Sequence, residues 1–307
     1  MPTSYRTVFC AAPQAQSPRS TRREPDSARV SMRERSRTAS IRRASLPAST
    51  KTRASPFTAS SGSPGGSFTN VDAPGAGTGN YQGTLLYDVN TSGATAGIYY
   101  GGNSTQHGLL RSATGTVTPV DPTGSIGTMV CEETCLNDSG ALTGFYFDAS
   151  QVIHGFLRDA GGNITRIDAP NAGTTAGQGT IAASIAADGS ITGYLIDSSG
   201  AIHSFVRSPS GTIASFDTPG AGSQPGQGTG VFSINASDAV TGEFIDSSGA
   251  MHGFTRSASG TIASFSAQGS GTTAGQGARP STNNVQGAVT GWWIDANGLN
   301  HGFAYTP

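Results

Sequence analysis

The stretch Ile191-Thr192-Gly193-Tyr194-Leu195-Ile196-Asp197, followed by His203-Ser204-Phe205-Val206-Arg207 and then Phe216-Asp217, occurs five times in this chain with small changes. A histidine marks each copy, and the five histidines lie 47, 49, 49 and 49 residues apart: His107, His154, His203, His252 and His301. Fixed periods of this length are typical of propellers, solenoids and other repeat arrays. We number the copies repeat one to repeat five in chain order.

Each repeat has the pattern of four short strands. In repeat three we expect strands over Thr180–Ile185, Ser190–Asp197, Ile202–Arg207 and Thr212–Asp217. Runs of Val, Ile, Thr, Tyr and Phe alternate there with Gly, Asp, Asn and Ser, which predicts all-β structure. A glycine such as Gly193 recurs in the second strand, where it either permits close backbone approach or leaves room for the phenylalanine of the next strand.

Four antiparallel strands in about 49 residues are the dimensions of a propeller blade. Repeat five stops after its third strand, at His301–Tyr305, and a surplus strand, Phe68–Asp72, precedes repeat one. We therefore predict a single five-bladed β-propeller over residues 61–307, closed by pairing of this N-terminal strand with the C-terminal one. Closure would remove exposed strand edges and favour a monomer.

The motif Thr-Gly-x-x-x-Asp-x-x-Gly-x-x-His-Gly-Phe-x-Arg, followed by Phe-Asp-x-Pro-Gly-Ala-Gly, resembles the HAF repeat family, which is named for a His-Ala-Phe motif. The resemblance covers residues 66–307. It implies a bacterial protein that is extracellular or on the cell surface, although no signal peptide is visible in this chain. The family has no established catalytic residues, so the resemblance transfers no site.

The N-terminal region differs from the repeats in charge. Residues 1–60 carry 12 of the 18 Lys and Arg and a balance of +9, whereas residues 61–307 have a balance of −10. This basic segment, rich in Arg, Ser, Pro and Ala, is expected to be disordered, and a mis-assigned start explains it equally well. It has few aromatic residues to interleave with its arginines, so we expect no nucleic-acid partner. The sequence has no run of 18 apolar residues, so we expect no transmembrane segment. The spacing of Cys131 and Cys135 does not decide whether they form a disulfide, so it does not indicate an oxidising or a reducing compartment.

Four repeats place an aspartate six residues before the histidine. A metal site or an acid–base pair in each blade is one reading. A structural hydrogen bond that satisfies a partly buried imidazole is the other, and we favour it because catalytic sites break repeat symmetry. No metal and no cofactor are expected. The pairs are Asp148/His154, Asp197/His203, Asp246/His252 and Asp295/His301.

An arginine four residues after the histidine also recurs, and we expect it to pair with the aspartate that follows the fourth strand. The arginines are Arg111, Arg158, Arg207 and Arg256, and the aspartates are Asp121, Asp168 and Asp217.

Glycine-rich loops of 10–13 residues join consecutive repeats and are expected on one face of the disc. Loops on a rigid scaffold commonly carry binding residues, so we predict a non-catalytic binding or scaffold module for a polysaccharide or a cell-surface protein. Repeats three and four should have equivalent sites and repeat two should differ. Trp292-Trp293, with Tyr99-Tyr100 and Phe145-Tyr146, could be stacking platforms, but we favour inter-blade core because adjacent residues of a strand face opposite ways and both sheet faces are buried. The candidate loop residues are Asp72, Gln82, Asp168, Gln178, Asp217, Gln227 and Gln276.

Two other functions stay open. A glycoside hydrolase would need an acid and a second carboxylate in the central channel, and the inner strands offer Asp88, Glu132 and Glu133. A purely structural cell-surface protein would need no ligand site at all.

Overall fold

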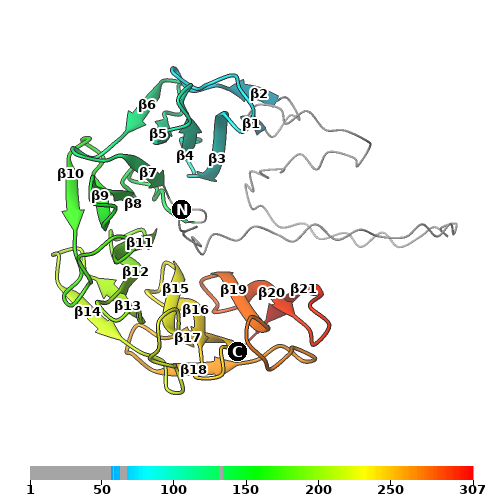
Figure 1. Cartoon of the computed structure of the whole chain (residues 1–307). Helices are drawn as coiled ribbons and strands as arrows, with labels where there is room; N and C mark the ends of the chain where they lie inside the picture. Colours follow the sequence, from blue (N-terminus) through cyan, green and yellow to red (C-terminus); the bar gives the residue numbers. More distant parts are fainter. Residues whose placement is uncertain (1–56, 58, 63–67, 131–133, 307) are drawn as a thin grey trace, which may run out of the picture. The chain divides into compact units, whose positions relative to one another are not determined.

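The computed structural model describes residues 57, 59–62, 68–130 and 134–306, all within one unit of the chain, residues 37–307. The described residues form 21 strands and no helix (Figure 1). The all-β prediction is therefore confirmed. The expected disordered segment, residues 1–60, lies outside the described residues except for 57, 59 and 60.

Repeats one to four each have four strands, repeat five has three, and a two-stranded hairpin precedes repeat one. The hairpin is β1 (Ala59–Gly62) and β2 (Phe68–Val71). Repeat one is β3 (Gly83–Val89), β4 (Thr95–Tyr100), β5 (Gln106–Arg111) and β6 (Val117–Val120). Repeat two is β7 (Gly127–Val130), β8 (Leu142–Phe147), β9 (Ile153–Arg158) and β10 (Ile164–Ile167). Repeat three is β11 (Gly179–Ile185), β12 (Ile191–Ile196), β13 (Ile202–Arg207) and β14 (Ile213–Phe216). Repeat four is β15 (Gly228–Ile234), β16 (Val240–Ile245), β17 (Met251–Arg256) and β18 (Ile262–Phe265). Repeat five is β19 (Gly277–Asn283), β20 (Val289–Ile294) and β21 (Asn300–Tyr305).

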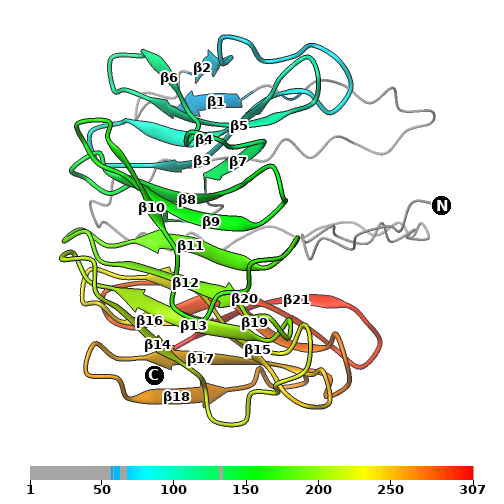
Figure 2. The ribbon, with the colours of Figure 1, turned by 60° about the vertical axis from the view of Figure 1, so that its left-hand side comes forward.

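Within a repeat, neighbouring strands pair antiparallel through tight turns (Figure 2). The turn between β12 and β13 shows the local cause. The Asp197 Oδ1 atom accepts the backbone N–H groups of Ser199 and Ala201, and Gly200 takes a φ of +88° that favours glycine. The strand glycine Gly193 has the first of its two expected roles, because a Cβ there would lie 2.0 Å from the Ile181 carbonyl oxygen.

Repeats two to five are joined to one another by a parallel bridge at the start of the first strand of each following repeat. Gly179 pairs with Ile153 of the preceding repeat, and Gly179 takes a φ of +128°. The same bridge occurs at Gly228 and at Gly277. Between the repeats, the phenylalanines of the third strands fill the core, and Phe156, Phe205 and Phe254 are fully buried.

The junction between repeats one and two is different. No parallel bridge joins β5 to β7 in the described residues, and β3–β6 form a separate four-stranded sheet. A side chain supplies a link instead, because the Gln106 Nε2 atom donates to the Thr128 carbonyl oxygen over 3.1 Å.

The structure does not show the predicted pairing of Phe68–Asp72 with His301–Tyr305. Strand β2 pairs with β1, and among the described strands β21 pairs only with β20. Phe57 and β1 take the place of a third strand: Ala59 opposes Val71 as Gly155 opposes Ile167, and Phe57 bridges Gly83 as Ile153 bridges Gly179. A hairpin between segments close in sequence closes a far shorter loop than pairing of the chain ends, so it costs less entropy.

Candidate functional site

The recurring histidine lies between two carboxylates. The His154 Nε2 atom is 3.2 Å from Asp148 Oδ2, and its Nδ1 atom is 2.7 Å from Asp168 Oδ1. In repeat three, His203 Nε2 is 3.4 Å from Asp197 Oδ2 and Nδ1 is 2.9 Å from Asp217 Oδ2. Both ring nitrogens are therefore occupied by partners within the protein.

In the other three repeats the histidine contacts one carboxylate instead of two. His107 contacts Asp121 at 2.9 Å, with Gly101 in place of the first aspartate. His252 contacts Asp246 at 2.9 Å and the Ser266 hydroxyl at 3.2 Å. His301 contacts Asp295 at 3.4 Å. The structure thus brings together all four predicted Asp–His pairs.

Sequence reasoning missed the second carboxylate, fourteen residues after the histidine, because it assigned that aspartate to an arginine. Arg158 Nη1 instead donates to the Asp159 carbonyl oxygen, and Arg207 and Arg256 do the same to the residue that follows each of them. The expected Arg–Asp pairing is therefore wrong in repeats two and three. The third strand pairs with the fourth in a register that places the aspartate beside the imidazole.

The pKa values follow from these contacts. Burial lowers the pKa of His203, but the hydrogen bonds and charges of Asp217 and Asp197 outweigh it and raise the pKa above 6.5. For Asp148, the backbone hydrogen bond from Val152 lowers the carboxyl pKa, and the contact with His154 adds to this. For Asp197, burial raises the pKa, but hydrogen bonds from Ser199, Ala201 and His203 lower it overall.

An aromatic ring covers the imidazole in four repeats but not in repeat three. The histidine ring centroid is 4.8 Å from that of Tyr99, 5.2 Å from Tyr146, 4.7 Å from Phe244 and 4.1 Å from Trp293. In repeat three the residue opposite the histidine is Leu195. The rings of Tyr99, Tyr146, Phe244 and Trp293 therefore lie against a histidine of the protein, so Trp293 is not a free platform for a ligand.

A pocket of about 330 Å³ opens at this position in repeat three. Leu195 has no ring to lie against the imidazole, and both Leu195 and His203 line the pocket. Two carboxylates and one imidazole meet three apolar side chains there. The residues that line the pocket include Pro170, Leu195, Asp197, His203, Phe216 and Asp217.

The glutamines of the glycine-rich loops form hydrogen bonds within the protein. Gln178 Oε1 accepts the Thr175 hydroxyl at 2.8 Å, and its Nε2 atom donates to the Ser198 carbonyl oxygen at 3.1 Å. Gln82, Gln227 and Gln276 bind the equivalent carbonyl oxygens of Gly102, Ser247 and Ala296. These side chains fix the loop to the turn of the next repeat. Among the loop aspartates, Asp168 and Asp217 contact histidines, whereas Asp72 is exposed at the end of β2.

Asp88, the channel acid of the hydrolase hypothesis, is bound to backbone amides. Its Oδ2 atom accepts the N–H groups of Cys135 and Leu136 at 2.8 and 2.9 Å, and Oδ1 accepts that of Val89 at 2.7 Å. Burial raises the pKa of Asp88, and the three amides act in the opposite direction. The Oδ2 atom therefore joins repeat one to repeat two, and Oδ1 is bound within repeat one. Glu132 and Glu133 lie outside the described residues, as does Cys131, whereas Cys135 is buried.

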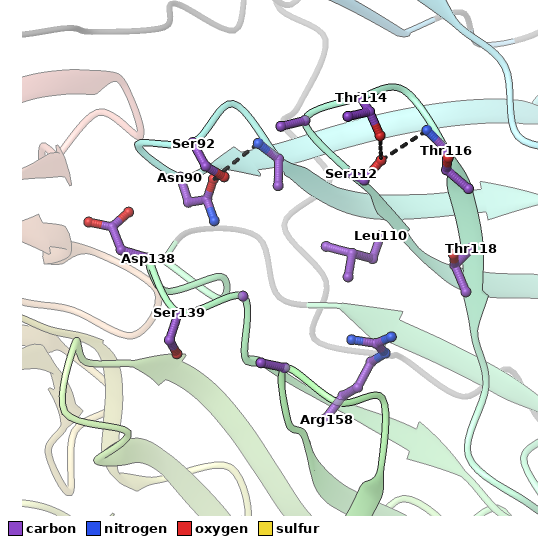
Figure 3. Close-up of a pocket in the computed structure, with 14 residues that line it drawn as sticks. Asn90, Ser92, Leu110, Ser112, Thr114, Thr116, Thr118, Asp138, Ser139 and Arg158 are labelled. Carbon is purple, nitrogen blue, oxygen red and sulfur yellow. Dashed lines mark hydrogen bonds between the residues drawn. The ribbon is translucent and has the colours of Figure 1, made fainter.

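A second, larger pocket of about 510 Å³ lies between repeats one and two at the opposite end of the strands (Figure 3). Hydroxyl groups dominate it, with Asp138 and Arg158 on either side of the hollow. Asp138 Oδ1 accepts the Thr91 N–H at 2.8 Å, so it already links the two repeats.

The described residues contain no cluster of three or more His, Cys, Asp or Glu arranged to hold a metal ion. Nor is any helix long and apolar enough to cross a membrane found in that part of the chain.

Comparison with known proteins identifies no family. No protein-family model matches the chain, and no curated protein matches it. Among solved structures, a streptogramin B lyase is 13% identical, with a TM-score of 0.48 over 81% of this chain and 76% of the other. The BP39L lectin from Burkholderia pseudomallei is 11% identical, with a TM-score of 0.44 over 81% and 78%. The six-bladed β-propeller lectin of Aleuria aurantia is 15% identical, with a TM-score of 0.34 over 72% and 74%.

Proposed function

We propose that the protein is a non-catalytic, extracellular saccharide-binding module whose site is the pocket of repeat three. One observation supports this above the others: Leu195 stands where every other repeat has an aromatic ring, and a pocket lined by Asp197, His203 and Asp217 opens there. Its volume of about 330 Å³ is at the lower end of the range for small-molecule sites.

The chemistry of the lining suits a sugar ring. The side chain of Asp217 is 51% exposed, so its carboxylate can accept ligand hydroxyl groups while His203 holds it in place. Leu195, Phe216 and Pro170 offer apolar surface for the C–H face of the ring. Catalysis is a poorer match, because both nitrogens of His203 are already bound to carboxylates.

We also propose that five blades close into a propeller by exchange of strands at the chain ends. Phe57 occupies the position beside Gly83, and β1 the position beside β2, that β21 would take in the closed ring. Two observations support the exchange. His301 contacts one aspartate and Asp72 lies exposed at the place of a second. Thr290 is exposed, whereas its counterpart Thr241 is fully buried by the following repeat.

The test of saccharide binding titrates the protein with methyl glycosides of neutral hexoses and with soluble dextran, and measures binding by saturation-transfer NMR of the ligand signals, which every variant can report. A dissociation constant of about 1 mM is expected for a single shallow site. Leu195→Phe gives repeat three the ring that repeat four has, leaves all polar groups in place and should abolish binding. Asp217→Ser copies Ser266 and should weaken it.

A gain-of-site variant provides the matched control. Phe244→Leu with Ser266→Asp reproduces the repeat-three pocket in repeat four and should add a second site of similar affinity. Equal binding by Leu195→Phe would place the ligand elsewhere. Cleavage of the glycosides would favour the hydrolase, and no binding of any probe would favour the scaffold.

A further inference from the structure

In repeat two, an arginine contacts the second carboxylate of the histidine. The Arg166 Nε atom donates to Asp168 Oδ2 over 2.5 Å, while Asp168 Oδ1 contacts the imidazole of His154. Burial raises the pKa of the Tyr146 hydroxyl, and the charge and hydrogen bond of Arg166 act in the opposite direction. The guanidinium of Arg166 therefore lies close to both Tyr146 and Asp168.

Repeat three lacks both the arginine and the aromatic ring. The strand register places Ser215 where repeat two has Arg166. It also places Leu195 where repeat two has Tyr146. Ser215 and Leu195 both line the pocket of about 330 Å³, together with the carboxylate of Asp217. The pocket therefore lies where repeat two holds an aromatic ring and a cation.

The pocket of repeat three has an excess of negative charge. Asp197 and Asp217 both contact His203, so two carboxylates share one imidazole, and a protonated imidazole still leaves one negative charge. None of the residues that line the pocket, all of them in the described part of the chain, is a lysine or an arginine. The side chain of Asp217 is half-exposed, so a ligand can reach its carboxylate.

The other repeats do not combine two carboxylates with the loss of the arginine. In repeats one, four and five, the histidine contacts a single carboxylate among the described residues, that of Asp121, Asp246 or Asp295. A protonated imidazole balances one carboxylate. In repeat two the additional charge of Arg166 balances the second carboxylate. The unbalanced carboxylate is therefore found in the repeat that has the pocket.

We propose that the repeat-three pocket selects an amino sugar, a saccharide with a protonated amine, over a neutral saccharide. The ammonium group donates to the carboxylate of Asp217, as the guanidinium of Arg166 does to Asp168, and the sugar ring lies against Leu195 and Phe216. Such a ligand supplies the ring and the cation that repeat two supplies with its own side chains. This inference rests on the proposed function and names the class of saccharide for the same site.

The experiment compares methyl glycosides that differ only in the group on the second carbon of the ring. The neutral hexose, the 2-amino sugar and the N-acetylated amino sugar are each used in the gluco and galacto series. Binding to the full chain is measured by saturation-transfer NMR at about pH 6, where the amine keeps its proton. We expect the amino sugar to bind about fivefold more tightly than the other two, the upper range for an exposed ion pair. High salt should remove this gain, because it screens exposed charges.

Two variants test the charge through the ratio of these affinities. Asp217→Asn keeps the size of the side chain, and Ser215→Arg copies the arginine of repeat two without changing any residue that contacts His203. The preference for the amino sugar should be lost in both, whatever the absolute affinity. Ser215→Arg should also keep the denaturation midpoint, which excludes unfolding as the cause. Asp168→Asn is the matched control, because Arg166 already binds that carboxylate, and it should keep the preference.

Three results would contradict the proposal, and they differ in what they leave standing. Equal binding of all the glycosides by the unsubstituted protein would overturn the amino-sugar preference and leave the saccharide site in place. Binding of Nα-acetyl-lysine amide as tight as that of the amino sugar would overturn it too, because the pocket would then recognise a cation without a sugar ring. No binding of any glycoside would overturn the proposed function as well.

Discussion

The Asn137 Nδ2 atom donates to the carbonyl oxygen of Ala186, one repeat further along the chain, over 3.2 Å. The same link runs from Asn90 to Asn137 and from Asn235 to Asn284. Each of these asparagines also caps its own turn, because its Oδ1 atom accepts the N–H group four residues on. This series of inter-repeat hydrogen bonds is interrupted at Ala186, because its methyl side chain cannot donate to the carbonyl oxygen of Asn235.

Restoring the missing link should stabilise the protein. Ala186→Asn is expected to raise the free energy of unfolding by about 0.5–1.5 kcal/mol, the net value of one hydrogen bond. Asn137→Ala should lower it by about 2 kcal/mol, because an inter-repeat bond and a turn cap are both lost. Equilibrium denaturation in urea measures both. Ala187→Asn, at the exposed neighbouring position, is the control, and a destabilised Ala186→Asn would contradict the stabilising role of this series.

The two residues of the Asp197–His203 pair should contribute unequally to stability. His203→Ala is expected to lower the melting temperature by about 2–4 °C, corresponding to roughly 1 kcal/mol in a domain of this size. Asp197→Ala should lower it further, because Asp197 Oδ1 also holds the β12–β13 turn. The double variant should cost less than the sum, since the two residues share one contact. Calorimetry measures all three; strict additivity would show that the pair has no coupling.

The stability supplied by the His203 contacts should depend on pH. The pKa of His203 is raised, so its contribution is complete below its usual value of 6.5 and is lost as pH rises through the higher folded value. The pKa of Asp197 is lowered, so its contribution is present above 3.8 and is lost as pH falls through the lower folded value.

The difference in unfolding free energy between the unsubstituted protein and His203→Ala should therefore be largest between about pH 4 and 6.5. Denaturation measured from pH 3 to 9 gives this profile. Asp217→Ser should bring the histidine pKa, followed by NMR, back toward its usual value. A difference that grows above pH 7 would contradict the assignment.

The sequence predicts the four-stranded repeat and its Asp–His pairs because both depend on short-range patterns. Turn residues and strand alternation fix the hairpin of β12 and β13, and that hairpin places Asp197 beside His203. The second carboxylate depends on the pairing of β13 with β14, where several partners for Asp217 were compatible with its spacing.

The candidate pocket was not predictable by counting repeat similarities. Repeats three and four are nearly alike in sequence, and equivalent sites were predicted there. The structure differs at Leu195 against Phe244, a change of side-chain volume that matters only because the residue opposes the histidine. The loop glutamines were predicted as ligand contacts, yet Gln178 is bound at both ends of its amide within the protein. A polar residue in a loop is expected to be exposed, but the sequence does not show whether its side chain is already hydrogen-bonded within the protein.

Cysteine cross-linking distinguishes the two pairings of β2. In the present structure Thr69 opposes Ser61. If β21 replaces β1 in the register of the other repeats, Thr69 would instead oppose Ala304, as Thr165 opposes Leu157. The chain with its own three cysteines replaced therefore receives Thr69→Cys with either Ser61→Cys or Ala304→Cys, and mild oxidation followed by peptide mass spectrometry identifies the bond.

A closed five-bladed propeller predicts efficient cross-linking of Thr69→Cys with Ala304→Cys and protection of the β21 edge. Asp72→Ala should then destabilise the protein, because Asp72 would contact His301 as Asp217 contacts His203. Cross-linking to Ser61→Cys alone, with no effect of Asp72→Ala, would leave β1 as the permanent partner of β2. Strands β1 and β21 compete for β2, because each offers it a row of backbone N–H and C=O groups. The strand that buries more apolar surface is favoured.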